Sequence, residues 1–428
     1  MRGFWLLCIL LACSVAARAQ SELPKNVLEL AQLKRNAAAE VARLSNFTCL
    51  ETVERSHRKS QEQPFRYADT VRLEVALSNN RELYGWPGAN HFEEHDVGDV
   101  VGSGTISSGS FASDVKAALV DNVSTIVWHG EEDIIGRRAL RWDYVVPYYL
   151  SGWIVEAGGH RGRVSATGSF WADAKTLELL RLRVNASDIP PDLPIMAAED
   201  TLDFARFRVG SRNLLLPQTA EFVLTDLRGR QSRNVMEFSH CREFTSEAKL
   251  SYEAPAVPEE HAAPATELAI PAGLLIDARL AEPIDSKVAA VGDPISATIE
   301  VPVKNKGQIL IPEGALLRGR LRRMEKDFTA GEHFVVGLEF TDIEFPGRHA
   351  RFFGDLVEMG PLPDSRWAIG AVASTTQSTI AGSTLTRTTV ERYTVRAIPG
   401  VGMFLMDGAS FRIAAGLRMV WRTVEIRK

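Results

Sequence analysis

Alternation of apolar and polar residues over long stretches is the feature that most limits the fold of this chain. Apolar side chains occupy every second position over residues 65–77, with Asp69 as the one interruption, and again over residues 164–170 and 180–186. Such a strand buries one face and exposes the other, which is typical of antiparallel sheets. Residues 173–176 carry turn-forming side chains and predict a hairpin between the last two strands.

A helix is expected before these strands. Apolar residues recur at three- and four-residue spacing from Val27 to Leu44, with Lys34, Arg35 and Glu40 between them, which predicts an amphipathic helix with one apolar stripe. A second, shorter helix is expected over residues 111–120. The predicted fold is mainly β: an N-terminal α+β domain, in which an open antiparallel half-barrel wraps on the long helix, and a C-terminal all-β barrel-like domain.

Composition divides the chain into parts. Its 428 residues exceed what one hydrophobic core usually serves, because domains mostly span about 100–200 residues. EAPAVPEEHAAPATE, at residues 253–267, is rich in proline, alanine and glutamate, as extended linkers are. We therefore predict a signal peptide at 1–19, an N-terminal domain at 20–252, a linker at 253–267 and a C-terminal domain at 268–428. A long polar loop is expected at 374–389.

The first residues resemble an export signal. One basic residue, Arg2, precedes an apolar run that ends in small residues, as in secretory signal peptides. Two processing sites compete: cleavage after Ala19, which makes Gln20 the first mature residue, and acylation of Cys13 in a lipoprotein-like sequence. The small-x-small pattern before Gln20 favours cleavage there. The expected location is the periplasm or the cell surface, with a lipid anchor on Cys13 as the alternative.

One phrase occurs twice in the C-terminal domain. IPAGLLIDARL at 270–280 and IPEGALLRGRL at 311–321 share I-P-x-G followed by an alternating segment. Proline suits the start of a strand because it lacks an N–H donor, and glycine permits a tight turn. Each copy therefore predicts a turn followed by a strand. KNKG at 304–307 predicts a hairpin tip, and a slip in the alternation at 341–343 predicts a bulge.

Both halves resemble known families. A long helix followed by an antiparallel meander resembles the LolA and LolB type of periplasmic lipoprotein carriers, in which a curved open sheet wraps a helix and shelters acyl chains. NFTCLETVER, GRVSATGSFWADAKTLELLRLRVNASDIP and LLLPQTAEF also resemble stretches of secreted, uncharacterised acidobacterial proteins, which implies no particular activity. Over residues 268–325 the order IPAGLLIDARLAEPIDSK, GDPISATI, GQILIPEGALLRGRL resembles the C-terminal β-barrel of TrbI-type conjugal-transfer proteins. That resemblance implies the barrel rather than the channel.

Motifs for catalysis or metal binding are sparse. HFEEH, from His91 to His95, matches the H-x-x-E-H of inverted zinc peptidases, but glycine and proline bracket it and no apolar helical face continues on either side. We expect an exposed loop there, with no metal and no cofactor. Asp192, Glu199 and Asp200 flank a proline-rich turn and are expected to be solvated rather than catalytic.

Net charge and hydropathy argue against a nucleic-acid partner and against a transmembrane helix after the signal. The formal net charge is −5, and no basic stripe with interleaved aromatic residues occurs, which argues against a nucleic-acid partner. After the signal, no apolar run reaches the ~18–20 residues that a transmembrane helix needs.

The favoured function is non-enzymatic. We expect the N-terminal domain to bind or carry an apolar ligand, a lipid or a lipoprotein-like molecule, between its helix and the concave face of its sheet. The alternative is a structural or docking module of a cell-envelope assembly or secretion complex, with an envelope protein as its partner. The predicted ligand-binding residues are Val71, Leu73, Val75, Leu77, Leu180, Leu182 and Val184.

The two cysteines of the mature chain are a disulfide candidate. Cys49 is placed in the first strand of the N-terminal domain and Cys241 in its last, and an oxidising envelope would allow them to pair. Two buried free thiols are the alternative, because free cysteine is among the most buried residue types.

Overall fold

The computed structural model describes residues 23–44, 47–78, 81–88, 92, 97–101, 104–107, 112–157, 159–243, 266–328, 332–367 and 398–425. The expectations for the signal peptide with Cys13 and Gln20, for His91 and His95, for most of the linker and for the loop at 374–389 concern residues outside these ranges. Within them the protein is mainly β, as predicted. None of the helices in these ranges combines the length and the apolar character needed to cross a membrane.

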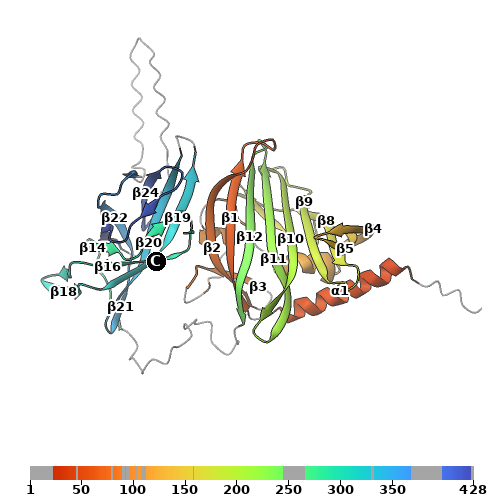
Figure 1. Cartoon of the computed structure of the whole chain (residues 1–428), viewed down its shortest axis with the longest axis horizontal. Helices are drawn as coiled ribbons and strands as arrows, with labels where there is room; N and C mark the ends of the chain where they lie inside the picture. The colour runs from red at the N-terminus through yellow and green to blue at the C-terminus, as the bar shows by residue number, and fades with distance from the viewer. Residues whose placement is uncertain are drawn as a thin grey trace, which may run out of the picture.

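The N-terminal half is one curved antiparallel sheet with a long helix. The helices are α1 (Lys25–Arg43), α2 (Val97–Val101), α3 (Ser113–Val115) and the π-helix η1 (Lys116–Val120), the last two lying where the second helix was expected. The strands are β1 (Phe47–Arg58), β2 (Arg66–Ser78), β3 (Arg81–Gly85), β4 (Thr125–Ile134), β5 (Arg137–Val146), β6 (Ile154–Ala157), β7 (His160–Arg163), β8 (Ser165–Asp173), β9 (Leu179–Ser187), β10 (Ile195–Val209), β11 (Arg212–Asp226) and β12 (Gln231–Glu243). The sheet has the order β3-β2-β1-β12-β11-β10-β9-β8-β5-β4, and β6 pairs with β7 apart from it (Figure 1).

Helix α1 packs on the sheet through the predicted stripe. Leu33, Ala37 and Val41 are buried and share a core cluster with residues of β5, β8 and β9. The first turn does not take part, because Val27 is 42% exposed. The helix thus covers the β5–β9 part of the sheet.

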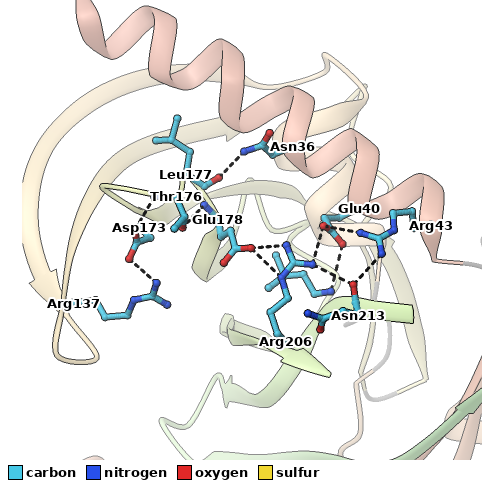
Figure 2. A network of polar contacts seen from close by, with 11 residues as sticks. Asn36, Glu40, Arg43, Arg137, Asp173, Thr176, Leu177, Glu178, Arg206 and Asn213 are labelled. Carbon is cyan, nitrogen blue, oxygen red and sulfur yellow. Dashed lines mark hydrogen bonds and ion pairs between the residues drawn. The ribbon is translucent and has the colours of Figure 1, made fainter. Parts of the chain in front are cut away.

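Polar contacts hold α1 over the turn between β8 and β9 (Figure 2). Asn36 Nδ2 donates to the carbonyl oxygen of Leu177 at 3.1 Å, and Glu40 pairs with Arg206 at 2.9 Å. The turn has the chemistry predicted for residues 173–176. Asp173 Oδ1 accepts hydrogen bonds from the backbone N–H groups two and three residues further on, the arrangement by which aspartate stabilises turns.

The face predicted for β2 is correct only in part. Asp69 and Tyr67 lie opposite consecutive residues of β1, so one residue of β2 bulges. Tyr67 consequently turns to the face of Thr70, and the two hydroxyl groups lie 3.1 Å apart, whereas the alternation placed Tyr67 beside Val71. Asp69, the interruption in the pattern, is buried and ion-paired with Arg55.

The strands that come first and last along the chain in this sheet, β1 and β12, are joined covalently. Cys49 of β1 and Cys241 of β12 form a disulfide, and the two strands are hydrogen-bonded neighbours. The register shifts at this point, and His240 has a positive φ of 49°. The extra residue in β12 is a bulge, which sets Cys241 against Cys49.

The C-terminal half is a second, strongly curled sheet. Its strands are β13 (Thr266–Glu267), β14 (Leu275–Leu280), β15 (Ile284–Asp285), β16 (Pro294–Ile299), β17 (Val303–Asn305), β18 (Gln308–Ile311), β19 (Leu316–Asp327), β20 (His333–Phe345), β21 (Arg348–Arg351), β22 (Gly354–Met359), β23 (Ser365–Trp367), β24 (Val401–Asp407), β25 (Arg412–Ile413) and β26 (Arg418–Thr423). The main path is β13-β21-β20-β19-β16-β14-β26-β22, and β24 pairs with β20 and β23. Strands β24 and β22 approach closely, since a Cβ on Gly402 would lie 2.6 Å from Leu356. The sheet is therefore barrel-like, as predicted.

Both copies of I-P-x-G form the predicted turn. Gly273 and Gly314 have φ values of 87° and 81°, a left-handed conformation that favours glycine, and β14 and β19 follow directly. These two strands flank β16 on either side, so the repeated phrase builds both neighbours of one strand. The hairpin tip at KNKG joins β17 to β18, and the bulge predicted at 341–343 falls at Thr341, which the register skips.

The two sheets meet along the outer side of β2 (Figure 1). The backbone N–H of Arg72 donates to Val291 and that of Val291 donates to Thr70, both at 2.8 Å. The Arg72 guanidinium also pairs with Asp293 at 2.6 Å. Because successive side chains of a strand point to opposite faces, Leu73 turns inward, away from this contact.

Candidate functional site: a cavity on the inner face

A cavity of about 1350 Å³ lies on the inner face of the N-terminal sheet, the face that α1 covers. Ligand pockets commonly measure about 300–1,000 Å³, so this one has room for a large ligand. The β6–β7 hairpin, α3 and residues 104–107 line its other sides, and the cavity is partly open to solvent. The apolar residues that the sheet contributes are Val146, Ala166, Val184, Ile195, Phe222 and Leu224.

A row of directly opposed residues crosses the inner face and forms part of the cavity wall. The row consists of Tyr144, Gly168, Val184, Asp200, Phe222 and Asn234, on β5, β8, β9, β10, β11 and β12. The next row, two residues along each strand, is entirely apolar: Trp142, Phe170, Leu182, Leu202, Ala220 and Met236. Opposed residues of antiparallel strands share a face. A row with three polar side chains, those of Tyr144, Asp200 and Asn234, therefore runs beside a fully apolar one.

Gly168 allows the neighbouring strands β5, β8 and β9 to pack closely at this row. A Cβ on Gly168 would lie 1.9 Å from the carbonyl oxygen of Arg183 and 3.0 Å from the ring of Tyr144. The same Arg183 carbonyl accepts a hydrogen bond from the Tyr144 hydroxyl at 3.2 Å. The glycine thus permits the tyrosine to lie flat across the neighbouring strand.

Asp200 is the unmatched polar group of the row. It is 4% exposed, and its Oδ1 has no hydrogen-bond partner among the described residues. Its neighbours in the row are Val184 and Phe222. Burial raises the pKa of Asp200 to about 7, and the charge of Glu82 adds to this effect. Asp114 of α3 lines the same cavity, and burial, followed by the charge of Asp200, raises its pKa well above the usual range.

Further titratable groups face the same interior. Burial raises the pKa of Glu51 to about 8, with contributions from Glu82 and Asp200. Burial also raises the pKa of Tyr144, with contributions from Asp114 and Asp200. These residues lie on strands that are not neighbours in the sheet. Their charges act on one another because the sheet curls.

The predicted ligand-binding residues do not gather at one place. The four on β2 are buried in the core cluster that both halves share: Val71, Leu73, Val75 and Leu77. Leu182 and Val184 pack in the cluster that contains α1. Leu180 packs with Ala139 and Trp171 in a third cluster, because a register shift after Trp171 removes it from the predicted face. Of the seven, Val184 is the one that lines the cavity.

The space between α1 and the sheet is small. The pocket there measures about 270 Å³, below the usual size of a ligand site. The helix is therefore packed against the sheet, and the larger space lies beside it.

The acidic residues near the proline-rich turn behave differently from one another. Asp192 and Glu199 are exposed, as expected, but Asp200 is buried, so the expectation was wrong for that residue. The sequence does hold a signal for this, since Ala198, Asp200 and Leu202 alternate along β10 and share its inner face.

Metal binding finds no support in the part of the chain that the structure describes, where no group of three or more His, Cys, Asp or Glu side chains could hold an ion.

Comparison with known proteins gives distant likenesses. No family model and no curated protein matches the chain. A domain from Vibrio parahaemolyticus described as an outer membrane lipoprotein-sorting protein is 14% identical, covers 51% of this chain and 92% of its own, and has a TM-score of 0.29. A DUF1329 family protein from Desulfovibrio piger is 12% identical, with coverage of 52% and 96% and a TM-score of 0.27. A LolA superfamily protein from Nitrosomonas europaea is 8% identical, with coverage of 52% and 97% and a TM-score of 0.26.

Proposed function

We propose that the N-terminal domain is a non-enzymatic binding module for an amphiphilic ligand, a lipid or lipoprotein-like molecule, in the cell envelope. The observation that supports this most is the cavity of about 1350 Å³ on the inner face. Native interiors are close-packed and contain few voids larger than a water molecule. This space is a recess that is partly open to solvent, and its wall carries apolar residues from several strands beside polar ones, which fits an amphiphilic ligand better than a filled core.

The apolar wall can supply the binding energy. Burying one CH₂ group is worth about 0.8 kcal/mol, so a chain of about fourteen carbons gains roughly 11 kcal/mol when fully buried. Ordering the ligand and the surrounding side chains offsets part of this gain. Half of it would still keep a ligand bound through a mild purification.

Narrowing the cavity is expected to weaken lipid binding. Ala166 lies on β8 and lines the cavity, so Ala166→Phe places a ring in the ligand space. The full chain purified from its native envelope should release lipid on extraction, whereas the Ala166→Phe protein should release at least about tenfold less, the loss that displacing two CH₂ groups would cause. Quantitative lipid analysis by mass spectrometry gives the readout.

Val127→Phe is the matched control, because Val127 is 63% exposed on β4 and its enlargement leaves the cavity unchanged. The Val127→Phe protein should keep the thermal midpoint of the parent, and the Ala166→Phe protein should still unfold cooperatively. A parent protein that is purified empty and takes up no lipid probe would contradict the proposal and favour the alternative, a docking module of an envelope assembly.

A further inference from the structure

We propose that Asp200 and Asp114 form a polar site in the cavity that selects amphiphiles with a cationic ammonium head group. This inference rests on the binding function proposed above and names the class of its ligand. Asp200 reaches the cavity from β10 and Asp114 from α3. Two carboxyl groups from different elements of the fold therefore line one space, whose wall is partly apolar.

The state of Asp200 points to a ligand. The residue is 96% buried, and its Oδ1 has no hydrogen-bond partner among the described residues. The buried carboxylate of Asp69 differs, because Arg55 pairs with it. A buried polar atom without a partner destabilises the folded protein. A ligand that donates a hydrogen bond to Oδ1 would remove this cost.

An ammonium group suits these two carboxyl groups better than other head groups. It offers three N–H donors and a positive charge, and hydrogen bonds between charged partners are about twice as strong as neutral ones. Burial raises the pKa of both carboxyl groups, and the negative charges of Asp200 and Glu82 raise the pKa of Asp114 further. A cation beside these groups counters both effects. Glu51, Glu82 and Tyr144 face the same interior and add no positive charge.

Two arginines of the cavity, Arg228 and Arg230, lie away from this site. Arg228 and Arg230 belong to the turn after β11, at least four residues beyond Phe222, which is roughly 13 Å along a strand. Arg230 is paired with Asp226 at 2.6 Å. Arg161 comes from the β6–β7 hairpin. A cationic head group beside Asp200 can therefore avoid the repulsion of Arg228 and Arg230.

Three probes with the same twelve-carbon chain test the inference: dodecylamine, dodecanol and dodecanoate. Equilibrium dialysis against the full chain at neutral pH, below micelle-forming concentrations, is expected to give dodecylamine at least about tenfold higher affinity than dodecanol, as one charge-assisted hydrogen bond would. Dodecanoate should bind most weakly. Asp200→Asn should reduce the affinity for dodecylamine to that for dodecanol, and it should leave the affinity for dodecanol unchanged.

Two further variants keep the test decisive. Glu199→Gln is the matched control, since Glu199 is the exposed neighbour on the same strand and its loss should change no affinity. Asp114→Asn repeats the test from α3 if Asp200→Asn fails to fold. Equal affinity for amine and alcohol, or a preference for dodecanoate, would overturn the inference and leave the proposed function standing. Failure of all three probes to bind would overturn both.

Discussion

Replacing Cys49 and Cys241 together by alanine is expected to lower the free energy of unfolding by roughly 3–5 kcal/mol. The disulfide joins residues 192 positions apart and so closes almost the whole N-terminal domain, from β1 to β12, into one covalent loop. Closing a loop restricts the unfolded chain more than the folded one, and the effect grows slowly with loop length. The bridge also links two neighbouring strands inside the sheet, where the first strand of the domain meets its last.

Urea unfolding of the parent and of the double variant measures the difference. Treating the parent with a reductant should bring its unfolding midpoint to that of the double variant, and the same reductant should leave the double variant unchanged. The prediction is wrong if the two proteins unfold alike without reductant, or if peptide mapping under non-reducing conditions finds both thiols free.

Local patterns in the sequence were enough to predict several elements of this fold. Leu33, Ala37 and Val41 form the buried face of α1. Apolar residues that recur every 3.6 positions lie on one side of a helix, so the pattern predicts both the helix and its buried face. The turns at Gly273 and Gly314 follow equally from local chemistry, since each needs a positive φ. These features depend on residues close together in the chain.

The location of the ligand space depends on contacts that are distant in the chain. Asp200 meets Val184 and Phe222 through the registers of three strands, and a single bulge after Trp171 turns Leu180 to another cluster. A one-residue shift moves a side chain to the opposite face, so alternation alone could not assign β9 correctly. Asp200 was expected to be solvated because a carboxyl group near a proline-rich turn usually is, although its alternation with Ala198 and Leu202 is a signal for the inner face of β10.

Burial of Glu51 on the inner face is expected to lower the free energy of unfolding as the pH rises, and Glu51→Gln is expected to remove this loss. Glu51 is 3% exposed on β1, between Leu73 of β2 and Phe238 of β12. Burial raises its pKa from 4.5 to about 8, so the folded protein holds this proton more tightly than the unfolded chain does. Below pH 4.5 Glu51 is protonated in both the folded and the unfolded state, so its titration does not change the free energy of unfolding. Between pH 4.5 and 8 the unfolded chain releases its proton first, and stability falls as pH rises by up to about 1.4 kcal/mol per pH unit.

Urea unfolding of the parent and of Glu51→Gln at pH 5, 7 and 8 tests this. The advantage of the variant should be small at pH 5 and grow to several kcal/mol at pH 8, since glutamine keeps the shape of the protonated acid without its titration. Glu54→Gln, at an exposed position of the same strand, should show no such growth. Asp200 and Asp114 have pKa values raised in the same direction, so the parent should still lose some stability with rising pH after Glu51 is replaced. A difference between parent and Glu51→Gln that stays constant from pH 5 to pH 8 would show that Glu51 titrates normally, and the inner face would then be wetter than its burial indicates.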